Sequence, residues 1–147
     1  MKKQILNVVV TLVVIAALSI AGFAGLDRSV KANIPFDFMV SGKKLTAGKY
    51  TVEMGIARSA LMVRNWKTKQ AASSITQDYE VRADSKPRLV FHRYGNQYFL
   101  AKVITYSNGI ELPKSKAERE AAKAKRDLLT MKDAEPEIVT VNAQIGQ

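Results

Sequence analysis

The stretch RLVFHRYGNQYFLAKVITY, residues 88–106, decides the fold of this chain. Two runs of aromatic and β-branched residues flank Gly95-Asn96, a pair typical of short loops, so the stretch predicts a β-hairpin. A two-residue loop fixes five facing pairs: Tyr94–Gln97, Arg93–Tyr98, His92–Phe99, Phe91–Leu100 and Val90–Ala101. Both faces carry apolar residues, so we expect the hairpin to lie centrally in its sheet with cover on each side.

Shorter runs before the hairpin alternate between apolar and polar residues, as strands with one buried face do. The clearest is residues 30–40, where Pro35 favours an edge strand or a bulge because proline cannot donate to a strand ladder. Turns at 41–44 and 47–48 lead to further expected strands at 49–54 and 61–66, and to one or two extended segments within 71–81. The pattern predicts a mainly β protein with a single antiparallel β-sandwich or small barrel.

The chain changes character after Gly109. Ser115 and Glu118 fit a capping box, which predicts an α-helix from residue 116 to about Met131. The stripe that would dock this helix is mostly alanine, so its burial should be shallow: Ala117, Ala121, Ala124, Leu128 and Met131. Residues 138–145 alternate again and predict a final strand, which either closes the parent sheet or pairs with another chain.

The first residues are typical of an export signal. Lys2 and Lys3 precede a long uncharged run, and Gly22 and Ala24 supply the small residues that a signal peptidase requires before Gly25. The alternative is an uncleaved membrane anchor, since about 20 apolar residues can span a bilayer. The predicted organisation is therefore a signal peptide (1–24), a β-rich domain (25–109) and a C-terminal helix with a terminal strand (110–147), in a secreted or periplasmic protein.

The charge lies mainly in the β-rich part. The chain has a formal net charge of +10, residues 25–108 carry +8, and residues 109–147 are neutral. An exported basic body would meet anionic polysaccharide, lipid head groups or teichoic-type polymers more often than nucleic acid. The alternative is that the charge only keeps the protein soluble. With no Cys and one His, the sequence excludes disulfides, Cys nucleophiles and multi-histidine sites, and no motif indicates a cofactor or a metal ion.

Few residues are candidates for chemistry. The single histidine, His92, has no acid near it in sequence, and we interpret it as a packed residue. Asp37 and Glu53 are the only notable candidates for a glycosidase pair, but nothing in the sequence fixes their separation. An aromatic platform for sugars would combine Trp66 with four tyrosines: Tyr79, Tyr94, Tyr98 and Tyr106. The candidate binding surface consists of Trp66, His92, Arg93, Tyr94 and Tyr98, and the protein is not expected to be an enzyme.

Five motifs in three regions of the chain carry a resemblance to a known family. They are IPFDF (34–38) with LTAGKY (45–50), FHRYG (91–95) with YFL (98–100), and ELPKSKAERE (111–120). Together they resemble a family of small exported bacterial proteins of unknown function, in which Pro is more frequent at the position of Thr46. The resemblance implies export and a β-rich body followed by a helix. It implies no catalytic residue and no ligand.

These observations predict an exported, non-catalytic structural or interaction protein of the cell envelope or extracellular space. Its basic β body would contact anionic polymers or a partner protein. The alternative is a small-ligand or carbohydrate-binding protein with a lipocalin-like cavity. A membrane is expected as a partner only if the N-terminal segment stays uncleaved, and oligomers are expected only through the terminal strand.

Overall fold

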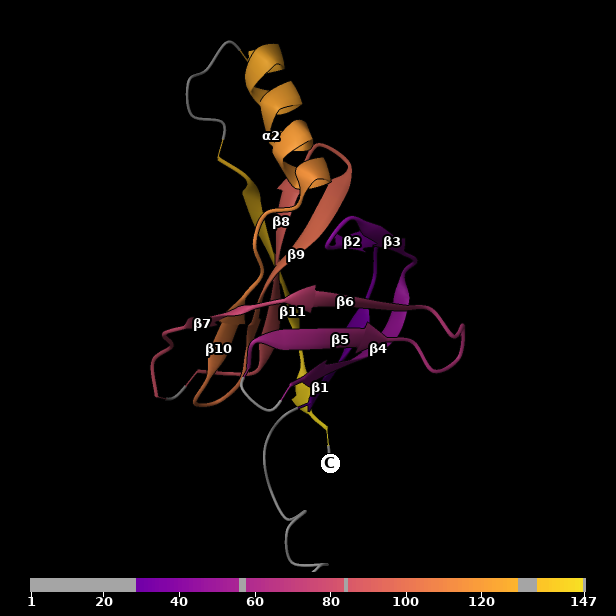
Figure 1. The fold of residues 1–147 in the computed structure, drawn as a ribbon, viewed down its shortest axis with the longest axis vertical. Coiled ribbons are helices and arrows are strands. Elements are labelled where there is room, and N and C mark those ends of the chain that lie inside the picture. Colours follow the sequence, from indigo (N-terminus) through magenta and orange to yellow (C-terminus); the bar gives the residue numbers. More distant parts are fainter. Residues whose placement is uncertain (1–28, 56–57, 84, 130–134, 147) are drawn as a thin grey trace, which may run out of the picture.

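The computed structural model describes residues 29–55, 58–83, 85–129 and 135–146 (Figure 1). The predicted signal peptide and its cleavage position lie outside these residues. In chain order the elements are β1 (Ser29–Ile34), β2 (Phe38–Val40), β3 (Lys43–Leu45), β4 (Gly48–Met54), β5 (Ala60–Arg64), β6 (Ala71–Ile75), β7 (Gln77–Tyr79), β8 (Arg88–Tyr94), β9 (Gln97–Ile104), β10 (Gly109–Glu111), α2 (Lys116–Leu129), β11 (Glu137–Asn142) and β12 (Gln144–Ile145). No helix among them is both long and apolar enough to span a membrane.

The strands form two sheets, and the prediction of a mainly β protein is confirmed. The first sheet has the order β12-β1-β4-β5-β6, and the second has the order β11-β8-β9-β10-β7. β2 joins the second sheet through a parallel contact with β9, and β3 pairs with β2. In Figure 1 the strands β5 and β6 run across β8 and β9. The described strands therefore form two packed sheets, and they do not form a closed barrel.

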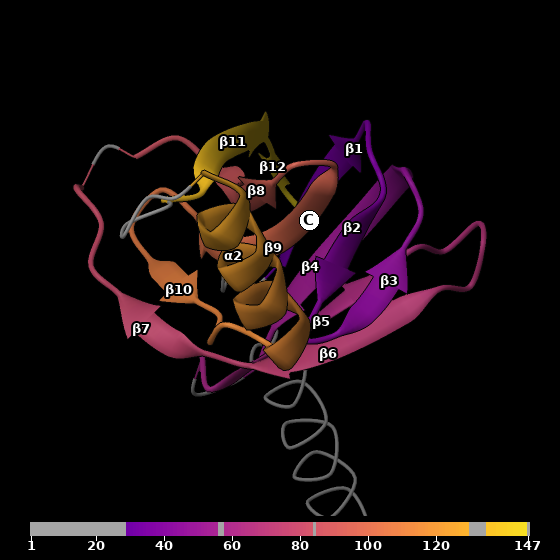
Figure 2. The same ribbon diagram turned by 90° about the horizontal axis from the view of Figure 1, so that it is seen from above.

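The described chain passes from one sheet to the other four times, and at two of these crossings a single residue separates the consecutive strands. β6 continues through Thr76 into β7, and β11 continues through Ala143 into β12, on opposite sides of the molecule (Figure 2). The Ala143 N–H donates to the Pro87 carbonyl at 3.0 Å where the chain turns. Strands that switch sheets form the corners of crossed sheet packings. The final strand thus pairs within its own chain, with β8 and then with β1, and it closes both parent sheets.

One apolar core lies between the sheets. Its largest fully buried side chains come from both of them: Tyr50, Leu61 and Ile34 from the first, and Phe38, Phe91, Leu89 and Ile110 from the second. Phe38 packs edge-on against Tyr50 and against Phe91, with ring centroids 5.0 and 5.5 Å apart. Such contacts contribute about 0.5–1.5 kcal/mol beyond the burial of apolar area. Phe38 therefore joins the two sheets at the centre of the core.

The expected single strand over residues 30–40 is wrong. Its alternation continues throughout, but the chain bends at Pro35 to Asp37, so that β1 lies in the first sheet and β2 in the second. Pro35 marks the interruption, in keeping with its missing N–H donor. Because both sheets face the same core, Ile34 and Phe38 are both buried, and the period of two survives the bend.

The central hairpin is confirmed, with one correction to its register. β8 and β9 have neighbours on both sides in the second sheet, and four of the five expected pairs are observed. The fifth predicted pair, Val90–Ala101, does not form. A bulge between Val90 and Phe91 shifts the register of the ladder, so Val90 faces Lys102. A bulge adds one unpaired residue to one strand and increases the local twist.

The helix α2 begins where the capping motif predicts. Ser115 Oγ accepts a hydrogen bond from the Glu118 N–H at 3.2 Å, which is the first half of a capping box. The Glu118 carboxylate does not complete the box and instead contacts His92. Ala117 and Ala121 are half-buried, whereas Ala124 and Leu128 are exposed, so the helix docks only through its first turns; Met131 lies outside the described residues.

Candidate functional site

An open groove lies on the outer face of the first sheet. In β1 and β4 alternate residues face the core, so the residues between them point outward. Lys31 pairs with Gln144 on one side and with Thr51 on the other, and Asn33 pairs with Lys49. Facing residues of antiparallel strands project to the same side of the sheet. These residues and Trp66 line a groove of about 1080 Å³, called the outer groove below.

Two segments of chain border the outer groove, one at each end. The corner between β11 and β12, residues 142–144, borders it on one side, and the turn of residues 65–68 after β5 borders it on the other. Three strand-to-strand spacings separate β12 from β5, a span of about 14 Å. This span is longer than a single sugar ring. The groove therefore has room for a segment of a polymer.

The lining of the outer groove is basic. Lys31, Lys49 and Lys67 contribute exposed side chains, and no lining residue is an Asp or a Glu. Within the described part of the chain, none of these three lysines takes part in an ion pair. Lys31 and Lys49 occupy diagonal positions on adjacent strands, which are about 7–8 Å apart in an antiparallel sheet. The lining of the groove thus presents a net positive charge. The nearest carboxylate on β4 is Glu53, which lies outside the lining at a position diagonal to Lys31.

Trp66 is held at the edge of the outer groove. Its side chain is 56% exposed, and the Arg64 guanidinium carbon lies 4.6 Å from the ring centroid. The buried Asn65 fixes the turn, because its Oδ1 accepts hydrogen bonds from the N–H groups of Lys67 and Thr68, each at 3.0 Å. A cation over an indole face contributes about 0.5–1 kcal/mol at an exposed site. The aromatic ring is therefore preorganised and remains accessible.

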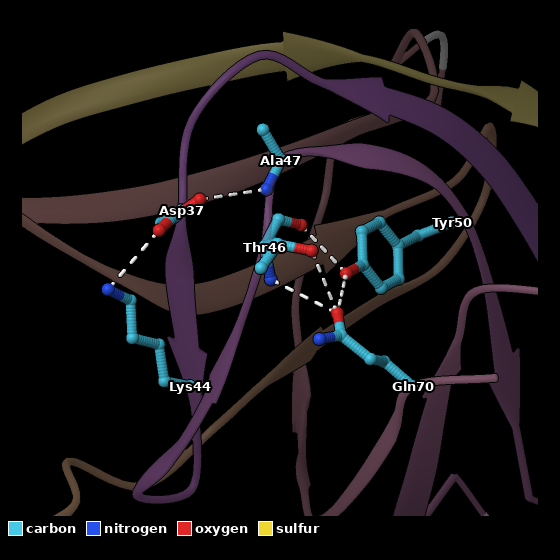
Figure 3. A network of polar contacts seen from close by, with 6 residues as sticks. All are labelled: Asp37, Lys44, Thr46, Ala47, Tyr50 and Gln70. Carbon is cyan, nitrogen blue, oxygen red and sulfur yellow. Dashed lines mark hydrogen bonds and ion pairs between the residues drawn. The ribbon is translucent and has the colours of Figure 1, made fainter. Parts of the chain in front are cut away.

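A polar network fixes the rim of the groove at residues 46–48 (Figure 3). Asp37 Oδ1 accepts the Ala47 N–H at 3.0 Å, and its Oδ2 lies 3.2 Å from Lys44 Nζ. The hydrogen bond from the Ala47 N–H, followed by the Lys44 ammonium, lowers the pKa of the Asp37 carboxyl below its ordinary value. Asp37, from the motif IPFDF, thereby ties the loop after β1 to the turn before β4.

Gln70, which immediately precedes β6, secures the same rim. Its Oε1 accepts hydrogen bonds from the Thr46 N–H at 3.2 Å and from the Thr46 hydroxyl at 2.9 Å (Figure 3). The Tyr50 hydroxyl lies 2.7 Å from the Thr46 carbonyl and 3.1 Å from Gln70 Oε1, and with one proton it donates to the nearer carbonyl. The motif LTAGKY therefore builds the rim of the groove.

Gly48 lets the rim approach Asn65 closely. A Cβ atom at this position would lie 2.9 Å from Asn65 Nδ2, closer than side chains tolerate. Both residues line the outer groove. Asn65 Oδ1 accepts two backbone hydrogen bonds, whereas the amide nitrogen of the same side chain donates none to the described residues. The groove therefore contains a nearly buried Asn65 whose amide nitrogen remains accessible and has no hydrogen-bond acceptor among the described residues.

The other four residues of the predicted binding surface lie elsewhere, on the β8–β9 hairpin next to α2. His92 Nδ1 lies 2.7 Å from Glu118 Oε1, and the two side chains are 13% and 5% exposed. The Tyr94 hydroxyl is buried without a hydrogen-bond partner among the described residues. Burial, and then the charge of Glu118, raise the pKa of Tyr94 to about 12. His92 is thus a packed residue, and the acid beside it comes from another element.

Arg93 and Tyr98 form a separate contact on the same hairpin. The Arg93 guanidinium carbon lies 5.4 Å from the Tyr98 ring centroid, and Arg93 Nη1 lies 3.3 Å from Glu137 Oε2 on β11. Tyr98 also stacks on Phe36, with ring centroids 3.9 Å apart. These contacts link the hairpin to its neighbours, and the structure does not bring them together with Trp66.

The remaining candidates from the sequence are also dispersed. Tyr79 lies on β7 beneath Lys102 Nζ, 3.8 Å from its ring centroid, and Tyr106 is exposed after β9. Asp37 contacts the rim at Ala47, whereas Glu53 lies near the opposite end of β4, about 20 Å farther along the chain. Glycosidase carboxylates are about 5–10 Å apart. These two carboxylates are therefore too far apart to act as a hydrolytic pair.

Sequence reasoning missed most of the outer groove. Trp66 was a candidate, but Lys31, Lys49, Asn65 and Gln144 were not, because they come together only through the pairing of distant strands. The available signal was the net charge of +8 over residues 25–108. This chain matches no family model, no curated protein and no solved structure.

Proposed function

We propose that this chain is an exported, non-catalytic binding protein whose outer groove contacts an anionic polymer of the cell envelope or extracellular space. The observation that carries the proposal is the lining of the groove, with three exposed lysines and no carboxylate. Clefts lined by one sign of charge concentrate the field of that charge and attract ligands of the opposite sign. A polymer suits the groove because the span across its strands exceeds one sugar ring.

Three further observations support a binding role. The β-rich part carries +8 of the formal net charge of +10. The rim of the groove is fixed by Asp37 and Gln70, so little ordering is needed when a ligand binds. Asp37 and Glu53 are too far apart for glycoside hydrolysis, and Glu118 engages His92 in a nearly buried pair. The space between the sheets is filled by core side chains, so the described residues give no support to a lipocalin-like cavity.

The proposal is tested by retention on an immobilised anionic polysaccharide over a range of salt concentrations. The triple variant K31E/K49E/K67E reverses the charge of the groove. Its matched control, K43E/K86E/K114E, makes the same change in net charge at exposed lysines that do not line the groove. We expect salt-dependent retention of the wild type, weakened about tenfold or more in the groove variant and much less in the control.

Two outcomes would contradict this proposal. Equal losses in both triple variants would mean that net charge, and not the groove, drives retention. Retention that does not change with salt would exclude an electrostatic contact. Export is tested separately by the intact mass of the protein from fractionated cells and medium. We expect a species that begins at Gly25 in the periplasm or medium, and full-length protein in the membrane pellet would contradict cleavage.

A further inference from the structure

We propose that the ligand of the outer groove is an acidic polysaccharide, with one sugar ring stacked on Trp66 and its acidic groups paired with Lys31 and Lys49. This inference rests on the proposed function and assigns the chemical class of the polymer. Its basis is the combination, in a single groove, of an exposed indole, lysines that form no ion pair within the described residues, and many amide and hydroxyl side chains.

The first step concerns Trp66. Single exposed apolar residues are common on protein surfaces, so exposure by itself indicates little. Trp66 differs because Arg64 lies against its ring and Asn65 fixes its turn. A rigid aromatic surface binds the apolar face of a ring with little loss of conformational entropy. The flat C–H face of a sugar is such a ring, and its hydroxyl edge can reach the polar groups beside it.

The second step concerns those polar groups. Sugar hydroxyls both donate and accept hydrogen bonds, and amide and hydroxyl side chains offer both functions. The groove presents such groups from β1, β4, the 65–68 turn and the β11–β12 corner: Asn33, Thr51, Asn65, Thr68, Asn142 and Gln144. Asn65 is 4% exposed, and its amide nitrogen makes no hydrogen bond to the described residues. A sugar hydroxyl or carboxylate would satisfy that donor.

The third step separates a polysaccharide from a nucleic acid. Grooves that bind single strands without sequence preference stack successive bases on several aromatic side chains. The described lining has two aromatic residues, and Tyr50 is buried in the core, with its hydroxyl donating to the Thr46 carbonyl. This leaves Trp66 as the stacking surface. One aromatic ring among many amides suits a chain of sugars better than a series of bases.

The experiment uses Trp66 itself as the reporter. It is the only tryptophan in the chain, so intrinsic tryptophan fluorescence reports on the outer groove alone. The probes are polygalacturonate as the acidic polysaccharide, dextran as the neutral one, polyphosphate as a polyanion without rings, and a single-stranded oligonucleotide. Calorimetry supplies affinities for variants that lack the indole. The variants are W66A, W66F and K31A/K49A, with Y106A as the control for loss of an equally exposed aromatic side chain.

We expect polygalacturonate to change the fluorescence and to bind more tightly than the other three probes. W66A should weaken its binding about tenfold, W66F should retain part of it, and Y106A should leave it unchanged. K31A/K49A should weaken it and reduce its dependence on salt. Because these side chains are exposed, circular dichroism and melting temperature should stay close to the wild type.

The outcomes distinguish this inference from the proposed function. If polyphosphate or the oligonucleotide binds as tightly as polygalacturonate, or if W66A binds normally, the polysaccharide assignment is wrong while the basic groove stands. If dextran binds as tightly as polygalacturonate, the acidic groups are not recognised. If K31A/K49A binds every polyanion as the wild type does, both the assignment and the proposed function fail.

Discussion

Nδ1 of His92 on β8 lies 2.7 Å from Oε1 of Glu118 in the first turn of α2, and the two residues are 26 positions apart in the sequence. This nearly buried pair joins the helix to the second sheet. Ala124 and Leu128 farther along α2 are exposed, so the contact between helix and sheet is confined to the first turns.

We expect Glu118→Gln to lower the free energy of unfolding by about 1–3 kcal/mol, because it replaces a charge-assisted hydrogen bond within a buried site. The matched control is Glu120→Gln on the same helix. Glu120 forms an exposed pair with Lys116 at 3.9 Å, so its loss should cost well under 1 kcal/mol. Urea unfolding measures both variants, and equal losses would show that His92 does not anchor the helix.

The Tyr94 hydroxyl provides a prediction at alkaline pH. The pKa of this phenol is raised from 10.0 to about 12, so the folded state holds its proton more tightly than the unfolded state does. The resulting stability is fully present below about pH 10 and is lost as the pH rises towards about 12. Tyr94→Phe should remove the part of the alkaline loss of stability that comes from this phenol. It should change stability little at lower pH, since the hydroxyl meets no hydrogen-bond criterion with the described residues. An unchanged alkaline profile in urea unfolding would contradict the prediction.

Asp37 provides the corresponding prediction at acidic pH. Its pKa is lowered below 3.8, first by the hydrogen bond from the Ala47 N–H and then by Lys44. The folded state therefore gains stability from the carboxylate above the unfolded pKa, and that gain disappears as the pH falls through the lower folded value. Carboxyl titration by NMR should show Asp37 ionising below 3.8 in the wild type and closer to its ordinary value in Lys44→Ala. A titration at the ordinary value in the wild type would show that the rim contact is absent in solution.

The close approach of Gly48 to Asn65 at the groove can be tested by substitution. Gly48→Ala places a Cβ 2.9 Å from Asn65 Nδ2, so the amide or the rim must move. We expect a loss of about 1–3 kcal/mol in stability together with weaker polymer binding. In a double-mutant cycle, Asn65→Ala should relieve part of the stability cost of Gly48→Ala, because it removes the atom that clashes. Strict additivity of the two changes would contradict the contact.

Pairing of the terminal strand with both sheets can be tested by deleting it. β11 and β12 pair with β8 and β1 within the chain, so deleting residues 137–147 exposes one edge of each sheet and part of the core. We expect the truncated protein to unfold at a clearly lower temperature and to aggregate, because exposed strand edges pair with other chains. If the truncation changed only the mass in solution and not the melting temperature, the strand would pair between chains instead.

The sequence predicted those parts of the fold that depend on nearby residues. The hairpin around Gly95-Asn96 is set by a short loop and by alternation on each side, and four of its five pairs are observed. The cap at Ser115 is likewise local. The bend at Pro35 was missed because both sheets bury the same alternate positions, so the pattern is identical for one strand and for two.

The site was harder to predict because strand pairing assembles it. Lys31 lies beside Thr51 and Gln144 only after β1 has paired with β4 on one side and with β12 on the other. Similarly, Glu118 reaches His92 through the position of α2 and not through proximity in the sequence. Alternation identified the outward-facing residues of each strand, but it carried no information on which strands are neighbours.

The most direct test of the central claim is the mapping of polygalacturonate binding by NMR chemical shifts of the backbone amides. We predict that the perturbed amides cluster on β1, on β4, in residues 65–68 and at the β11–β12 corner, and that the Trp66 indole N–H shifts with them. Perturbations confined to α2 and the β8–β9 hairpin, or no perturbation at all, would contradict the assignment of the outer groove as the binding site.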